Sequence, residues 1–112
     1  MADPVALYDE ADKLKAAGDL DGAAAKFEEA IAADETYALA HSALAVVQQK
    51  LGAHDKAIEH AKRVCELEPN DAFSYTALSV TFQRAYAGTG DTSYIALAEE
   101  AMATSRTIEA GG

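Results

Sequence analysis

The sequence predicts an all-α protein, built as a stack of three antiparallel helix pairs. The first observation is a repeat of 34 residues, which carries Gly18 to Gly52 and Asp21 to Asp55. The same spacing joins Ala11 to Ala45, Ala23 to Ala57, Ala43 to Ala77, Leu44 to Leu78, Val46 to Val80 and Gln49 to Gln83. A fixed period of this length is typical of helical-pair units, none of which can bury its apolar face alone.

Composition and patterning support the same class. Ala, Glu, Lys and Leu are common, only two prolines are present and tryptophan is absent, which favours helix over strand. No alternating apolar and polar stretch is long enough to suggest a sheet. At 112 residues the chain has the length of one domain. We expect a single domain over 1–112, with repeat units of approximately 4–37, 38–71 and 72–110.

The first unit begins with a strong helix start. Asp3 is an N-cap residue, and Pro4 suits the first turn because its missing N–H has no helical partner there. The helix should run to about Ala17 and end at Gly18, which tolerates a left-handed C-cap. Asp19 or Asp21 caps the second helix, whose apolar stripe is Ala23, Ala24, Phe27, Ala30 and Ile31.

The second unit repeats this plan. After the break at 34–36, a helix should run from about Tyr37 to Gly52. We expect Asp55 to cap the next helix, which continues until Pro69 prevents its extension. The apolar stripe of that helix is Ala57, Ile58, Ala61, Val64 and Cys65.

The third unit opens at Asn70 and Asp71, and its apolar positions are Phe73, Tyr75, Ala77, Leu78 and Phe82. The period then fails, because Tyr86 stands where the next turn glycine belongs. We expect an inserted loop over 87–93, followed by a helix whose stripe is Tyr94, Leu97, Ala98, Ala101, Ser105 and Ile108. Aligning Leu97 with Ala57 requires an insertion of six residues. A shift of seven would bury Glu99 without a partner, which is costly.

These units resemble tetratricopeptide repeats over nearly the whole chain. The second unit carries the pattern as His41, Leu44, Ala45, Gln48, Ala57, Ala61 and Pro69. The third has Tyr75, Leu78, Ser79, Phe82, Leu97 and Ala101, and the first has Leu7, Glu10, Ala11, Leu14, Ala23, Phe27 and Glu35. The resemblance implies a right-handed superhelical stack, an α-solenoid in which small residues allow the paired helices to approach closely.

The resemblance also implies a binding groove on the concave face, lined by the first helix of each pair. By the repeat offset, the lining residues are Tyr8, Asp12, Lys15, Leu39, Ser42, Val46, Gln49, Lys50, Phe73, Thr76, Val80, Gln83 and Arg84. We expect a protein or peptide partner there, either an extended segment or a helix, because amide side chains beside an apolar floor suit a peptide backbone.

Two groups in this set have alternative structural roles. Val46 and Val80 serve equally well in packing between helices. Lys15, Lys50 and Arg84 are interpreted either as a basic edge or as cations that offset helix dipoles near C-termini. The carboxylate clamp found in chaperone-tail receptors of this family is not expected, because its places hold Tyr8, Asp12, Ala43, Phe73 and Ala77.

Charge restricts the class of partner. Nine basic residues against nineteen acidic ones give a formal net charge of −10. Such a chain repels phosphate and anionic lipid, so we expect neither nucleic acid nor membrane as a partner. The single cysteine fits a reducing compartment, no secretory signal is evident, and the cytoplasm is the predicted location.

No catalytic constellation emerges, so the chain is predicted to be non-enzymatic and to need no cofactor or metal. His54, His60 and Cys65 point to different sides of their helix, and metal ligation would need same-face spacing. His41 occupies a packing position, and Cys65 falls on the buried stripe. The segment 88–90 lacks the lysine of a phosphate loop.

The alternative function is self-assembly through the terminal helix. Repeat arrays need polar capping units at their ends, and no separate capping helix follows the last stripe. Ile95 and Met102, seven residues apart, lie off that stripe. They are interpreted either as a weak homo-oligomer contact or as scattered apolar residues on the surface.

Overall fold

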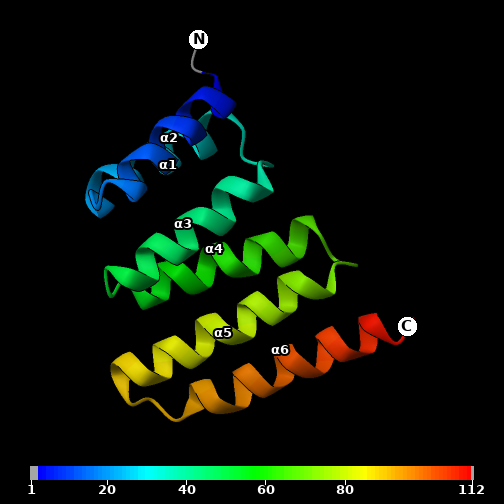
Figure 1. Cartoon of the computed structure of the whole chain (residues 1–112). Coiled ribbons are helices and arrows are strands. Elements are labelled where there is room, and N and C mark those ends of the chain that lie inside the picture. Colours follow the sequence, from blue (N-terminus) through cyan, green and yellow to red (C-terminus); the bar gives the residue numbers. More distant parts are fainter. Residues whose placement is uncertain (1–2, 112) are drawn as a thin grey trace.

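The computed structural model describes residues 3–111, and it confirms the all-α class (Figure 1). Six helices occupy this part of the chain, and no strand is present within it. They are α1 (Pro4–Ala16), α2 (Leu20–Ala33), α3 (Ala38–Lys50), α4 (His54–Leu67), α5 (Ala72–Thr89) and α6 (Ser93–Glu109).

The helices form three hairpins that stack in chain order. α1 packs on α2, α3 on α4 and α5 on α6, while α2–α3 and α4–α5 contacts join successive pairs. In Figure 1 the pair α1–α2 lies at one end of the stack and α6 at the other. The principal extents of 40 × 33 × 19 Å describe a flattened body, as expected when layers contact only their neighbours.

Local signals set most of the helix boundaries. The side chains of Asp3, Asp19 and Asp71 each accept a hydrogen bond from a backbone N–H in the helix that follows, as N-caps do. Gly18 and Gly52 have φ of 87° and 80°, in the left-handed region where glycine has no Cβ penalty.

The expected cap of α4 was wrong. Asp55 lies inside the first turn, because α4 begins at His54 and its N-cap residue is Ala53, which makes no side-chain capping bond. The Asp55 carboxylate still stands near the positive end of the helix dipole. It accepts a 3.4 Å hydrogen bond from the hydroxyl of Tyr94 in α6.

The expected inserted loop over 87–93 was also wrong, because the extra residues lengthen helices. The connection within each hairpin spans three residues: 17–19, 51–53 and 90–92. α5 has 18 residues where α1 and α3 each have 13, and α6 has 17 where α2 and α4 have 14. Gly88 lies inside α5, where a Cβ would collide with the imidazole of His54. Helix α5 ends at Gly90.

The six-residue offset itself holds. At a spacing of 40, three buried residues of α4 have buried counterparts in α6: Ile58 and Ala98, Ala61 and Ala101, Cys65 and Ser105. Glu99 is exposed, as the six-residue shift requires. Leu97 is the exception, since it was expected to be buried and its side chain is exposed.

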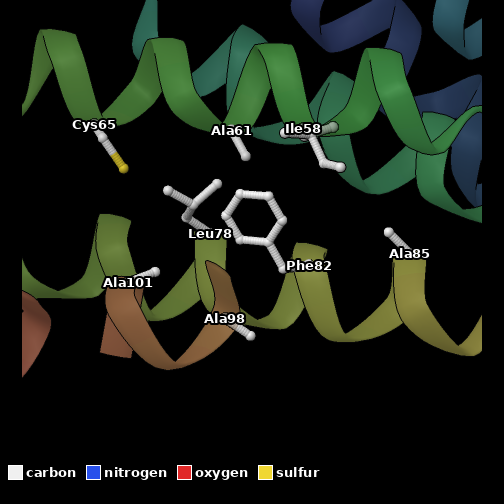
Figure 2. Close-up of a cluster of buried hydrophobic side chains, with 9 residues drawn as sticks. Ile58, Ala61, Cys65, Leu78, Phe82, Ala85, Ala98 and Ala101 are labelled. Carbon is white, nitrogen blue, oxygen red and sulfur yellow. The ribbon is translucent and has the colours of Figure 1, made fainter. Parts of the chain in front are cut away.

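The core consists of two clusters that each join neighbouring hairpins. In Figure 2, Ile58, Ala61 and Cys65 of α4 face Leu78 and Phe82 of α5. The remaining buried members of this cluster are Ala45, Ala85, Ala98 and Ala101. The second cluster joins the first two hairpins and contains Ala11, Ala23, Phe27, Leu44 and Val47.

Small hydroxyl residues bind α5 to α6. The buried Ser79 hydroxyl donates a 2.8 Å hydrogen bond to the carbonyl of Ala98. From the opposite helix, the Ser105 hydroxyl donates a 3.0 Å hydrogen bond to the carbonyl of Ala72. Ser79 is at one of the positions where the repeat pattern requires a small side chain. The two serines therefore let α5 and α6 approach closely while their hydroxyl groups remain hydrogen-bonded.

Two histidines, the buried His41 of α3 and the half-buried His60 of α4, lie between these helices. His41 Nε2 is 2.8 Å from the carbonyl oxygen of Glu35, which confirms its expected place in the core. His60 Nδ1 lies 2.9 Å from Gln48 Oε1, and the two imidazoles are 5.4 Å apart. Burial is the main factor that lowers the pKa of His60, and the nearby His41 acts in the same direction.

We predict that Ala57→Leu lowers the free energy of unfolding by about 1–3 kcal/mol, because Ala57 is fully buried between helices and extra methylenes overpack such a contact. Urea denaturation followed by circular dichroism measures this change. Ala103→Leu, an exposed position on α6, is the matched control and should change stability by less than about 0.5 kcal/mol. Equal effects of the two substitutions would contradict the packing described here.

The partly buried His60 should make stability depend on pH. The folded state holds the pKa of His60 below 6.5, so the unfolded chain binds the proton more readily. The contribution of neutral His60 to the free energy of unfolding is therefore complete above about pH 6.5. This contribution declines as the pH falls through the pKa of His60 in the folded state. His60→Gln should flatten the curve of unfolding free energy against pH in that window. An unchanged slope in the variant would assign the pH dependence to other groups.

Candidate protein-binding surface

A hollow of about 460 Å³ opens between α3 and α5, over side chains of α4. We name it the central hollow. It is lined by Ala38, Leu39, Ser42, Ala45, Val46, Gln49, Ala61, Val64, Glu68, Asp71, Phe73, Ser74, Thr76, Ala77, Val80 and Thr81. The lining is mostly apolar, with a few polar groups at its rim, which is the usual composition of a binding site.

The structure brings seven of the thirteen expected groove residues to this hollow. They are Leu39, Ser42, Val46 and Gln49 from α3, and Phe73, Thr76 and Val80 from α5. Large apolar side chains among them face solvent: Phe73 is 75% exposed, Leu39 is 61% exposed, and Val46 and Val80 are each 38% exposed. Exposed apolar side chains gathered at one concavity are unusual on a monomer surface and mark interaction sites.

The charge of the central hollow differs from the basic edge expected from the sequence. Its charged lining residues are Glu68 and Asp71, at the end of α4 and the start of α5. Lys50 is the last residue of α3 and does not line the hollow. Arg84 lies more than one turn before the end of α5 at Thr89, and no basic residue is in the last turn of that helix, so its interpretation as a cation at a helix C-terminus is wrong. The central hollow is therefore acidic at one end.

The expected residues from the first hairpin lie elsewhere. Tyr8 is partly buried and packs against the second core cluster, with its ring 5.3 Å from that of Phe27 and 5.7 Å from that of Tyr37. Burial raises the pKa of the Tyr8 phenol, and the nearby Asp12 adds to this effect. Asp12 and Lys15 are on α1, and neither lines the hollow.

A second hollow of about 550 Å³ lies on the α5–α6 hairpin. We name it the end hollow. Its lining residues are Ser79, Gln83, Tyr86, Ile95, Ala98, Glu99, Met102 and Arg106. It includes Gln83 from the expected groove, together with Ile95 and Met102, the two apolar residues that lie off the buried stripe of the last helix. The long α5 thus contributes to both hollows.

The acidic end of the central hollow was not anticipated, and neither was its floor. Ala61 and Val64 come from α4 and were expected only as packing residues. Glu68 and Asp71 belong to the turn between two hairpins, which the repeat offset does not assign to a groove. In the sequence, the only indication of this acidic end was that Glu68 comes directly before Pro69, where the helix must end. The structure places Glu68 and Asp71 in the lining of the same hollow.

The environment of Cys65 makes its thiol a poor nucleophile. The Cys65 thiol is buried and donates a 3.4 Å hydrogen bond to the carbonyl of Ser74. Burial raises its pKa to about 11, which keeps it protonated and poorly nucleophilic. Within residues 3–111, no three His, Cys, Asp or Glu side chains gather as a metal site. None of the helices in this range has the length and apolar character needed to cross a membrane.

The repeated hairpins, each stacked on its neighbour, define a class of protein, the helical-repeat proteins. The particular family follows from the sequence. Residues 14–79 match the family model of the tetratricopeptide repeat, and the chain belongs to this family. Tetratricopeptide repeats are in general protein-interaction modules.

Two crystal structures of MamA share the fold. One has a TM-score of 0.81 and 24% identity, with 95% of this chain and 54% of the MamA chain covered. The other has a TM-score of 0.80 and 24% identity, with 96% and 59% covered. The chain therefore spans somewhat more than half the length of these MamA chains. At this identity the likeness establishes the fold. No curated protein matches the sequence significantly.

We predict that the Cys65 thiol reacts slowly with a disulfide reagent such as Ellman's reagent at neutral pH in the native protein. Both its burial and its raised pKa reduce the thiolate available for attack. In urea the rate should rise to that of a free cysteine. Fast reaction of the native protein would show that α4 and α5 separate readily at this position.

Proposed function

We propose that the central hollow binds a short segment of a partner protein, and that the chain acts as a non-enzymatic adaptor. The observation that carries this proposal is the apolar rim. Phe73 and Leu39 are the two most exposed large apolar side chains described, and both line the same hollow as Val46 and Val80. Burial of these side chains by a partner would contribute about 25 cal/mol for each Å² of apolar area removed from water.

The lining suggests the chemistry of the segment. Apolar side chains of the partner would occupy the space between Val46 and Val80, and the Gln49 amide offers a donor and an acceptor to a peptide backbone. Glu68 lies at the rim, and no ion pair engages it among the described residues. A lysine or arginine of the partner would complement it. The proposed ligand is an apolar segment with a flanking basic residue, either extended or helical.

The expected affinity is micromolar, equivalent to about −8 kcal/mol. The hollow offers one exposed aromatic anchor, Phe73, and interfaces with few such anchors bind weakly. The proposed setting is the cytoplasm, where the buried thiol of Cys65 would remain reduced.

Selection from a display library of random peptides tests the proposal. We predict that the selected peptides share apolar residues and a Lys or Arg, and that the double variant Val46→Arg, Val80→Arg reduces their binding at least about 100-fold, because two buried guanidinium groups would lose hydration without partners. Glu68→Gln should weaken only peptides that carry the basic residue. Asp71 is unsuitable for this test, because it caps α5.

Val5→Arg is the matched control, since Val5 is an exposed valine on α1 that does not line the central hollow. It should leave binding unchanged. Circular dichroism should show equal helicity in all variants. Equal binding by the double variant and the unmodified protein would place the binding surface outside the central hollow.

A further inference from the structure

The end hollow lies on a surface that the interior hairpins use for contact. In the second hairpin, Ile58 packs in the core cluster with Leu78 and Phe82 of α5. Lys62 Nζ lies 5.9 Å from the centre of the Phe82 ring. The carboxylate of Asp55 accepts a hydrogen bond from the next hairpin. This side of α4 is therefore the junction between successive hairpins.

The same side of α6 carries the end hollow. At the spacing of 40 that relates α4 to α6, the counterparts of Asp55, Ile58 and Lys62 are Ile95, Ala98 and Met102, and all three line the end hollow. Within residues 3–111 no helix follows α6 on this side (Figure 1). Among the described residues, the surface is thus a hairpin junction that no further helix covers.

The side chains at the end hollow favour contact with another protein surface, because they are more apolar than their counterparts on α4. Two charged residues of the interior junction, Asp55 and Lys62, are replaced by Ile95 and Met102. Ile95 is 42% exposed, and the ring of Tyr86 is exposed beside it in the same hollow. The end hollow is therefore more apolar than the corresponding surface of α4.

The charges of the junction are arranged so that the surface complements itself. Glu99 and Arg106 lie on one face of α6, three residues before and four residues after Met102. Neither belongs to an ion pair among the described residues. If two α6 helices run antiparallel with their Met102 residues at the centre, each Glu99 meets the Arg106 of the other copy. A two-fold contact repeats this pair, as isologous interfaces do.

We propose that a second copy of this chain occupies the end hollow, with the two α6 helices antiparallel about a two-fold axis near Met102. Ile95, Ala98 and Met102 supply the apolar centre, and two Glu99–Arg106 pairs fix the register. This interface is separate from the central hollow and leaves that hollow accessible. Each dimer would then present two copies of the proposed peptide-binding surface.

Head-to-tail stacking is the competing arrangement, and the first helix opposes it. At the period of 34, Glu10 occupies the position of Leu44 and Leu78, both of which are buried at hairpin junctions. Glu10 instead forms a 3.4 Å ion pair with Lys26 in solvent. Docking α1 of one copy onto α6 of another would bury this carboxylate, which is costly.

Net charge does not prevent the two-fold contact. Residues 4–37 carry nine acidic side chains and three lysines, whereas residues 72–112 carry four acidic side chains and two arginines. The end hollow is therefore at the less acidic end of the stack. Repulsion between the distant acidic ends is screened over about 8 Å at physiological ionic strength.

Sedimentation velocity over a range of protein concentrations tests the proposal. The unmodified protein should show a reversible equilibrium between monomer and dimer. Glu99→Arg alone and Arg106→Glu alone each place like charges opposite one another, and each should weaken dimerisation by at least about tenfold. The double variant Glu99→Arg, Arg106→Glu restores opposite charges and should recover dimerisation close to that of the unmodified protein.

Glu100→Arg is the matched control, because it makes the same charge change at the adjacent exposed residue, which does not line the end hollow. It should leave dimerisation unchanged. The variant Val46→Arg, Val80→Arg should also dimerise normally, which separates this proposal from the peptide-binding one. Three results would overturn the proposal: a monomer at every concentration, growth beyond dimers as head-to-tail stacking requires, or a dimer unaffected by the charge changes. Circular dichroism confirms that each variant remains helical.

Discussion

The close approach of paired helices at small residues is the constraint on which the rest of the structure depends. Ala11, Ala23 and Ala57 are fully buried, and Ser79 has a hydroxyl small enough to reach the neighbouring carbonyl. Protein interiors are packed at crystal-like density, so a larger side chain at these contacts must displace a helix. Because each hairpin is closed in this way, its outer faces remain flat enough to receive the next hairpin. The position of both hollows follows from this stacking.

Most of the fold could be predicted from the sequence, because the repeat places the same side chains at the same contacts. The prediction failed where the repeat breaks. Gly88, Thr89 and Gly90 have the composition of a loop, yet α5 continues through Gly88 and Thr89 to its C-cap at Gly90. A Cβ on Gly88 would collide with the imidazole of His54 in α4. Local sequence does not encode that tertiary contact. The predicted N-cap of α4 was also wrong. Asp55 lies inside the first turn of the helix, where its carboxylate is near the positive end of the helix dipole.

The candidate site could be predicted only where neighbouring hairpins are equivalent. Val46 and Val80 lie at one repeat offset and converge on the same hollow. Tyr8 occupies an analogous position in α1 but packs on Phe27 and Tyr37, so the repeat offset alone does not fix the direction of its side chain. The acidic end at Glu68 comes from a turn between hairpins, where the period carries no information about side-chain direction. The charge of the proposed site therefore differs from the expected charge, whereas much of its expected location agrees with the hollow.

The central claim is that the partner segment binds between α3 and α5. Amide chemical-shift changes in ¹⁵N-labelled protein, measured during titration with a library-selected peptide, test it most directly. We expect the largest changes at Val46, Gln49, Phe73 and Val80, with little change along α1. Changes concentrated on α1, or on the outer face of α6, would contradict the claim, since they would show that the peptide binds outside the central hollow.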